Sequence, residues 1–157
     1  MRYRGFTLIE IIVSVTILLL LSGLFIANYT GFNSSQTVRQ AASDVIANLL
    51  AVRTMASAGI KPAGCDTLVG YTVKFPDPAT YTAQALCQVG EIPEITTYTL
   101  PTGVKFPSPL PASITFYALN RGASADQTIS IMGAGTTMKV SVFASGVVSD
   151  YIPTPTP

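Results

Sequence analysis

Residues 6–27 read FTLIEIIVSVTILLLLSGLFIA, and this stretch decides how the rest of the chain is organised. Its 22 residues include one charged side chain, that of Glu10, and no proline. As an α-helix the stretch would span roughly 33 Å, which is enough to cross the hydrocarbon core of a bilayer. The pattern therefore predicts a transmembrane helix over residues 6–27.

The charges on either side of this stretch predict its orientation. Arg2 and Arg4 precede it, and no basic residue lies near its far end. By the positive-inside rule, the N-terminus stays in the cytoplasm and the rest of the chain is exported. We expect a single-pass protein of the inner (cytoplasmic) membrane.

Glu10 does not suit a simple membrane anchor. A carboxylate at the bilayer centre costs on the order of 3 kcal/mol, although less near an interface, so such a residue is a functional candidate. A secretory signal peptide does not normally place an acid between its basic and apolar parts. An uncleaved anchor with Glu10 at the cytoplasmic interface is the alternative.

The six residues Gly5-Phe6-Thr7-Leu8-Ile9-Glu10 resemble the cleavage and methylation motif of type IV prepilins and type II secretion pseudopilins. The resemblance implies that a prepilin peptidase cuts between Gly5 and Phe6 and that Phe6 is then N-methylated. It also implies that Glu10 pairs with the new amino terminus of a neighbouring subunit. A buried carboxylate is tolerated when it is paired, which gives that role a physical basis.

The same resemblance implies a structural role and a set of partners. The chain would be a pilin, minor pilin or pseudopilin that leaves the membrane for an extracytoplasmic filament or the cell surface. Its partners would be the prepilin peptidase/methyltransferase, copies of itself and other pilins, the inner-membrane assembly platform, and membrane lipid.

A second helical pattern follows the apolar stretch. Apolar residues return at three- and four-residue steps up to about Ser57, which predicts an amphipathic continuation of the helix. Gly59 and Pro62 mark its expected end. The predicted buried stripe is Val38, Ala41, Ala42, Val45, Ile46, Leu49, Val52 and Ala56.

From Thr67 onward, short β-like runs alternate with turn formers. The runs are 68–75, 81–89, 95–100, 113–117, 128–132, 138–143 and 147–152. We predict an α+β fold in which the long N-terminal helix packs on a C-terminal antiparallel β-sheet domain, as in pilins. The parts are a cleaved leader (1–5), a transmembrane or filament-core helix (6–27), an amphipathic helix (28–58), a β-rich domain (59–152) and a Pro/Thr-rich mobile tail (153–157).

A weaker resemblance involves the C-terminal block. The stretch from Ala41 to Gly59, followed by the order of strands and glycine turns from Ile114 to Val148, is similar to a family of minor pseudopilins of type II secretion and the related minor pilins of type IV pili. Many members carry an arginine just after the last glycine, whereas Val147 follows Gly146 here. DNA is therefore not expected as a partner. A DNA-capturing minor pilin in competence remains an alternative, to be tested by changing Arg121 or Lys139 to Ala.

Cys65 and Cys87 are the two cysteines of the chain, and both follow the apolar stretch. Outside the cytoplasm a disulfide is the favoured interpretation, and two buried free thiols are the alternative. A bond closing this loop of 23 residues would stabilise the fold by roughly 3 kcal/mol.

The composition argues against an enzyme and gives no cofactor or metal site. The chain has no histidine, so Ser-His-Asp catalysis is excluded and a cysteine nucleophile would lack its usual base. Two cysteines without histidine cannot build a standard zinc site. An exported or membrane-anchored β-domain that serves as a binding module is the alternative from another functional class.

Overall fold

The computed structural model describes residues 7–151, apart from the side chains of residues 22–32, 34, 91–95, 150 and 151. The chain divides into two compact units, Met1–Ser34 and Ser35–Pro157, and each is described by itself. The predicted leader 1–5 and the predicted tail 153–157 lie outside the described residues.

The α-helix α1 (Leu8–Ser57) contributes residues to both units. Of the transmembrane helix predicted over 6–27, Phe6 and the side chains of 22–27 lie outside the described residues. Within the residues that are described, no helix is both long and apolar enough to cross a membrane.

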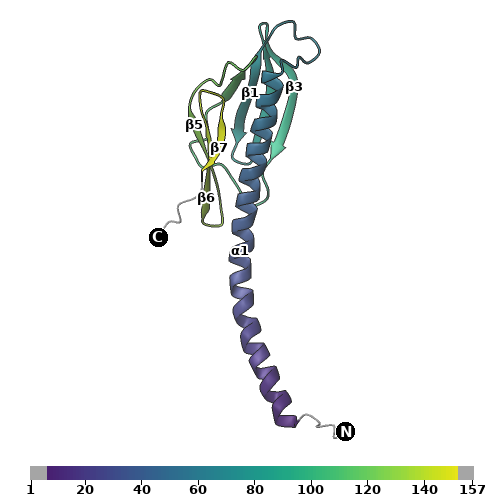
Figure 1. The fold of residues 1–157 in the computed structure, drawn as a ribbon, viewed down its shortest axis with the longest axis vertical. Helices are drawn as coiled ribbons and strands as arrows, with labels where there is room; N and C mark the ends of the chain where they lie inside the picture. The colour runs from purple at the N-terminus through teal and green to yellow at the C-terminus, as the bar shows by residue number, and fades with distance from the viewer. Residues whose placement is uncertain (1–6, 152–157) are drawn as a thin grey trace. The chain divides into compact units, whose positions relative to one another are not determined.

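In the second unit, the predicted apolar stripe of α1 faces the core. Ile46 is partly buried, and the other predicted positions, from Val38 to Ala56, are buried. The periodicity places these side chains on one side of the helix, where they share one core with residues of the sheets. Figure 1 shows this part of α1 lying along the strands. The amphipathic part of the prediction is confirmed.

The end of α1 follows from its backbone hydrogen bonds. The N–H of Ile60 donates to Met55 O at 3.1 Å, and the N–H of Gly59 donates to Ala56 O at 3.1 Å. Together they form a Schellman motif around Gly59, whose φ of 64° is in the left-handed region. The predicted stop at Gly59 is therefore correct.

Four strands form the larger sheet in the order β3-β2-β1-β4, with every neighbouring pair antiparallel. The strands are β1 (Leu68–Asp77), β2 (Thr80–Cys87), β3 (Gly90–Thr99) and β4 (Ile114–Tyr117). β3 begins five residues before the predicted 95–100 run. Pro93 obscured this part of the strand in the sequence, and an edge strand can accommodate a proline.

The turn between β1 and β2 is held by Asp77. Its carboxylate accepts the N–H groups of Ala79 at 2.8 Å and Thr80 at 2.9 Å, together with the Thr80 hydroxyl. These bonds, led by that of the hydroxyl, hold the pKa of Asp77 below its ordinary value. Asp77, which lies between Pro76 and Pro78, thus stabilises a tight turn.

A second, three-stranded antiparallel sheet has the order β5-β6-β7. Its strands are β5 (Gln127–Gly133), β6 (Thr136–Val142) and β7 (Val148–Tyr151). The α+β class and the antiparallel pairing are confirmed, and the division of the strands between two sheets is a feature that the sequence did not show. Among the described residues, an isolated bridge ties each sheet to a loop: Lys105, before β4, pairs with Met132 of β5, and Phe116 of β4 pairs with Ala123, before β5.

One hydrophobic core is shared by the helix and both sheets. Its largest fully buried side chains are Phe106, Phe116, Leu49, Ile114, Ile129 and Ile131. Phe106 lies in the loop between β3 and β4, so this loop fills the core as well as connecting strands.

The predicted disulfide is present between Cys65 and Cys87, with the two Cα atoms 5.8 Å apart. It ties the segment after α1 to the end of β2. Next to it, the N–H of Gln88 donates to Thr67 O at 3.0 Å, so the β2–β3 turn is fixed at the same place.

Removing this bond with Cys65→Ser and Cys87→Ser together is expected to lower the free energy of unfolding by about 3 kcal/mol, because the unfolded chain regains the freedom of the open loop. Urea unfolding of the oxidised chain in detergent micelles measures the change. Reducing agent should weaken the wild type similarly and leave the double variant unchanged. Equal unfolding midpoints for the oxidised wild type and the double variant would contradict the prediction.

Candidate anchoring and assembly segment

The described part of the first unit starts with a capped helix end. Thr7 is the N-cap residue of α1, and its hydroxyl oxygen accepts the N–H of Glu10 at 3.4 Å. Thr7 and Glu10 have the spacing of a capping box, which uses Thr or Ser followed three residues later by Glu or Gln. The prediction of the helix from its sequence missed this signal, although the spacing is visible there. It places the start of the helix immediately after the predicted cleavage site.

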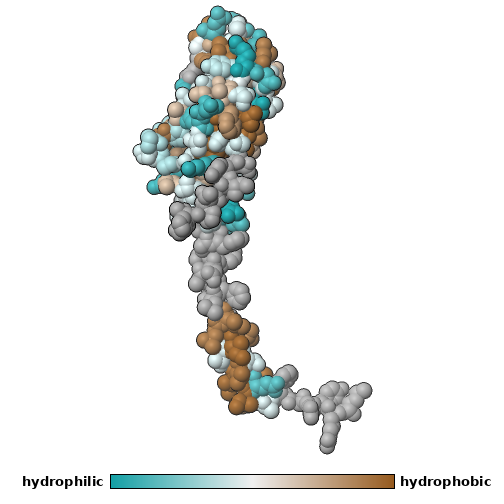
Figure 2. Space-filling view, turned by 60° about the vertical axis from the view of Figure 1, so that its left-hand side comes forward, coloured by the Kyte–Doolittle hydropathy of each residue, from teal (hydrophilic) through white to brown (hydrophobic). Residues whose placement is uncertain are grey.

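Apolar side chains surround the described part of this helix. All side chains from Thr7 to Leu21 are exposed. The large apolar ones range from 78% exposure at Leu8 to 49% at Leu21. Figure 2 shows this apolar surface in brown along the described helical part of the first unit. An exposed apolar surface of this length marks a site that lipid or another protein covers.

The hydroxyl groups within this surface are bonded to the helix itself. Ser14 Oγ donates to Glu10 O at 2.7 Å, and Thr16 Oγ1 donates to Ile12 O at 2.8 Å. Each hydroxyl thus reaches the carbonyl one turn back, so it needs no water or neighbouring helix as an acceptor. Ser14 and Thr16 therefore fit an apolar environment.

Glu10 carries the charge in the described stretch 7–21. It is in the first turn of α1, where a negative side chain interacts favourably with the helix dipole. Its side chain is exposed, and no hydrogen bond or ion pair of its carboxylate is found among the described residues. An apolar environment around this segment would require a cationic partner for Glu10.

The predicted site residues divide into three groups. Gly5 and Phe6 lie outside the described residues. Glu10 is at the exposed start of α1, and Cys65 with Cys87 form a bond in the globular unit. In the described part of the chain, no group of three or more acidic or cysteine side chains could hold a metal ion.

Comparison with known families gives a match at the same segment. Residues 1–26 match the family model of the prokaryotic N-terminal methylation motif. The chain carries the methylation motif of type IV prepilins and pseudopilins. The methylation motif includes Gly5, Phe6 and Glu10, so the first resemblance is confirmed.

The methylation motif ends before the globular unit begins. Neither the comparison with curated proteins nor the comparison with solved structures found a match. The resemblance of residues 41–59 and 114–148 to minor pseudopilins therefore stays a prediction. Arg121, in the turn after β4, and Lys139, in β6, are on separate elements.

Proposed function

We propose that this chain is a structural subunit, a pilin or a minor pilin or pseudopilin, of a type IV pilus-like or type II secretion-like filament. The observation that carries the proposal is the exposed apolar start of α1 with its single acid, within the methylation motif. A surface of this kind needs a permanent cover. Lipid covers it before assembly, and the helices of neighbouring subunits cover it afterwards.

In this proposal the chain is first held in the inner membrane with Arg2 and Arg4 on the cytoplasmic side. The prepilin peptidase cuts between Gly5 and Phe6 and methylates the new amino group. The predicted cut thus precedes the capped start of the helix at Thr7 in the sequence.

Glu10 supplies attraction between subunits. The methylated amine at Phe6 keeps its positive charge, and an isolated charge is unstable in an apolar fibre core. In an ion pair between this amine and Glu10 of a neighbouring subunit, each buried charge compensates the other. Because the acid and amine that meet belong to different copies, the same contact repeats along the fibre, as helical filaments require.

The globular unit has the opposite surface character. Its apolar stripe on α1, from Val38 to Ala56, is already covered by the two sheets. This unit therefore does not need the fibre core for its own folding. In the proposal it faces outward, and its loops determine which surfaces the filament contacts.

Intact-mass analysis and N-terminal sequencing of the chain, coexpressed with a prepilin peptidase, test this function. The expected product starts at Phe6 and carries one added methyl group. Gly5→Leu changes the residue before the cut, so this variant is expected to remain uncleaved and to retain Met1. A wild-type product that retains Met1, or one that starts near Asn28, would refute the processing step and favour an ordinary anchored or secreted domain.

The role of Glu10 in pairing between subunits can be tested separately. Replacing Glu10 by Leu should leave membrane insertion intact, because the helix becomes more apolar. Incorporation into filaments should fall about tenfold or more, because the amine of the adjacent subunit loses its partner. Quantification of the subunit in sheared filaments measures the change. Asp66→Asn, an exposed acid of the globular unit, is the control and should assemble normally; equal incorporation of the two variants would argue against pairing through Glu10.

A further inference from the structure

The globular unit has an elongated groove beside α1. Two adjoining hollows of about 450 and 530 Å³ share Pro101 as a wall. One side of the groove is α1 between Gln36 and Asn48, and the other is the end of β3 and the residues after it. The twelve-residue separation between Gln36 and Asn48 corresponds to a rise of roughly 18 Å along the helix. The groove can therefore hold an extended ligand made of several monomer units.

A pair of tyrosines forms the inner wall of the smaller hollow. The rings of Tyr81 and Tyr98 stack, with centroids 5.0 Å apart and planes 19° from parallel. The two residues are directly opposite each other on β2 and β3. Tyr81 is buried, whereas Tyr98 is partly exposed and stands on the edge strand. Tyr98 therefore offers an aromatic surface at the edge of the sheet, on a ring whose position is fixed by its neighbour.

Polar groups on α1 face the same hollow. Asn48 Nδ2 donates to the Tyr81 hydroxyl at 2.7 Å, which orients the amide. Gln40 Nε2 donates to Asp44 Oδ1 at 2.9 Å. The hydrogen bonds among the described residues leave Asn48 Oδ1 and Asp44 Oδ2 available as acceptors beside the tyrosines.

The Tyr81 hydroxyl stays protonated in this setting. Burial raises its pKa, Tyr98 and Asp44 raise it further, and the hydrogen bond from Asn48 opposes them. Because this hydroxyl accepts from Asn48, its own proton remains a donor. The hollow thus combines one donor, two oriented acceptors and an aromatic ring.

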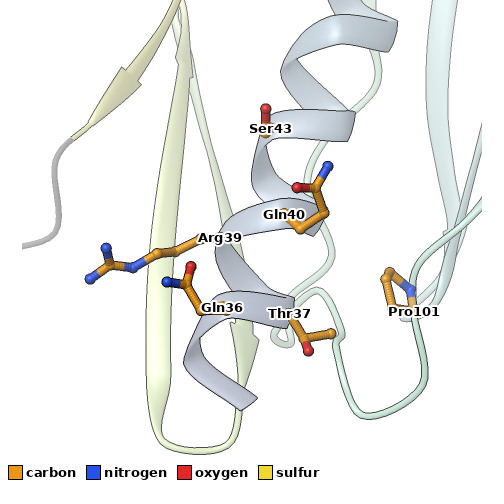
Figure 3. A pocket seen from close by; sticks show the side chains of 6 residues that line it. All are labelled: Gln36, Thr37, Arg39, Gln40, Ser43 and Pro101. Atoms are coloured by element: carbon orange, nitrogen blue, oxygen red, sulfur yellow. The ribbon is translucent and has the colours of Figure 1, made fainter. Parts of the chain in front are cut away.

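The charged side chains that line the groove are one acid and one base, Asp44 and Arg39. Asp44 places a carboxylate in the smaller hollow. The cation of the larger hollow, Arg39, extends away from Pro101 (Figure 3). The remaining α1 side chains of the larger hollow are amides and hydroxyls, namely Gln36, Thr37, Gln40 and Ser43. Among the described residues that line it, the groove therefore has no excess of positive charge of the kind that binds phosphate, nucleic acid or acidic peptides.

We propose that this groove binds a neutral saccharide. A sugar ring presents a C–H face, which packs on Tyr98, and a rim of hydroxyl groups, which donate to Asn48 Oδ1 and the Asp44 carboxylate. Further sugar units extend along α1 toward Gln36. A peptide added to the edge of β3 would be held by backbone bonds and would not require Tyr98 or the side chains of α1.

Ligand-observed saturation-transfer NMR on the full chain tests the site, in a detergent that contains no sugar. The probes are maltotriose, cellotriose and triacetylchitotriose, with trialanine as the peptide probe. We expect saturable binding of at least one trisaccharide. Tyr98→Ala should weaken that binding about tenfold, because the stacking surface is removed.

Tyr117→Ala is the matched control, since Tyr117 is a partly exposed tyrosine on the opposite edge strand, β4, and it should bind as the wild type does. Asp44→Ala changes an exposed helix position without disturbing the core, and it should also weaken binding. Binding of no trisaccharide, binding of trialanine alone, or equal affinities for the Asp44 variant and wild type would overturn the proposal. The groove is distinct from the processing segment, so a failure here leaves the filament proposal unaffected.

Discussion

Replacing Phe106 by alanine is expected to lower the free energy of unfolding of the globular unit by about 4 kcal/mol. The side chain is 1% exposed. Its ring packs edge-on against Phe75, with centroids 5.1 Å apart, and against Tyr81 at 6.0 Å. Alanine would remove these contacts and leave a cavity that the rigid sheet cannot fill. A loss of this size is a large part of the stability of an ordinary domain.

The measurement is urea unfolding of the full chain in detergent micelles, followed by the near-ultraviolet circular dichroism of its tyrosines. The chain has no tryptophan, and its tyrosine rings at positions 71, 81, 98 and 117 report on the globular unit. Phe143→Ala is the matched control, because Phe143 is 44% exposed and follows β6. Its substitution should cost about 1 kcal/mol or less. Similar losses for both variants would show that Phe106 does not fill the core.

Gly70→Ala is expected to destabilise the globular unit by about 4 kcal/mol, because it forces two strands apart. Gly70 pairs with Tyr117 of β4. A Cβ atom on Gly70 would stand 2.2 Å from the backbone oxygen of Phe116. A backbone oxygen within a sheet cannot move aside as a flexible side chain can, so the β1–β4 pairing would have to shift.

Gly64→Ala separates this steric effect from a general intolerance of glycine replacement. Gly64 has a φ of +81°, and a Cβ there would meet nothing within 4 Å. Its replacement should cost about 1 kcal/mol, from backbone strain alone. Both variants can be measured by the same urea unfolding. A Gly70 variant no weaker than the Gly64 variant would contradict the close approach of β4.

Local patterns predicted the elements of the fold well. Each of the seven strands in the described part of the chain overlaps a β-like run that was predicted from the sequence. The stripe from Val38 to Ala56 was found from its three- and four-residue steps, because a helix that packs on one side must repeat with its own period. The methylation motif was found from six adjacent residues, since a peptidase reads a short continuous segment.

The pairing of strands was not predictable in the same way. The β4–β1 pair joins residues more than forty positions apart in the sequence, as Ile114 opposite Val73 shows. The division into two sheets depends on where such distant strands meet, and no local pattern records it. The groove was also missed, because Asn48 and Tyr81 are brought together only when α1 packs on the sheet.

The sequence by itself determined the apolar segment with its single acid, the methylation motif, the helix period and the positions of the strands. Each is a property of neighbouring residues, and neighbouring residues set local conformation and recognition by processing enzymes. The tertiary structure alone decided that Phe106, a loop residue, fills the core and that Gly70 must lack a side chain. It also placed Tyr98, on the edge strand β3, beside Asn48 of α1. These features depend on which distant segments touch, and close packing fixes that only when the whole unit is assembled.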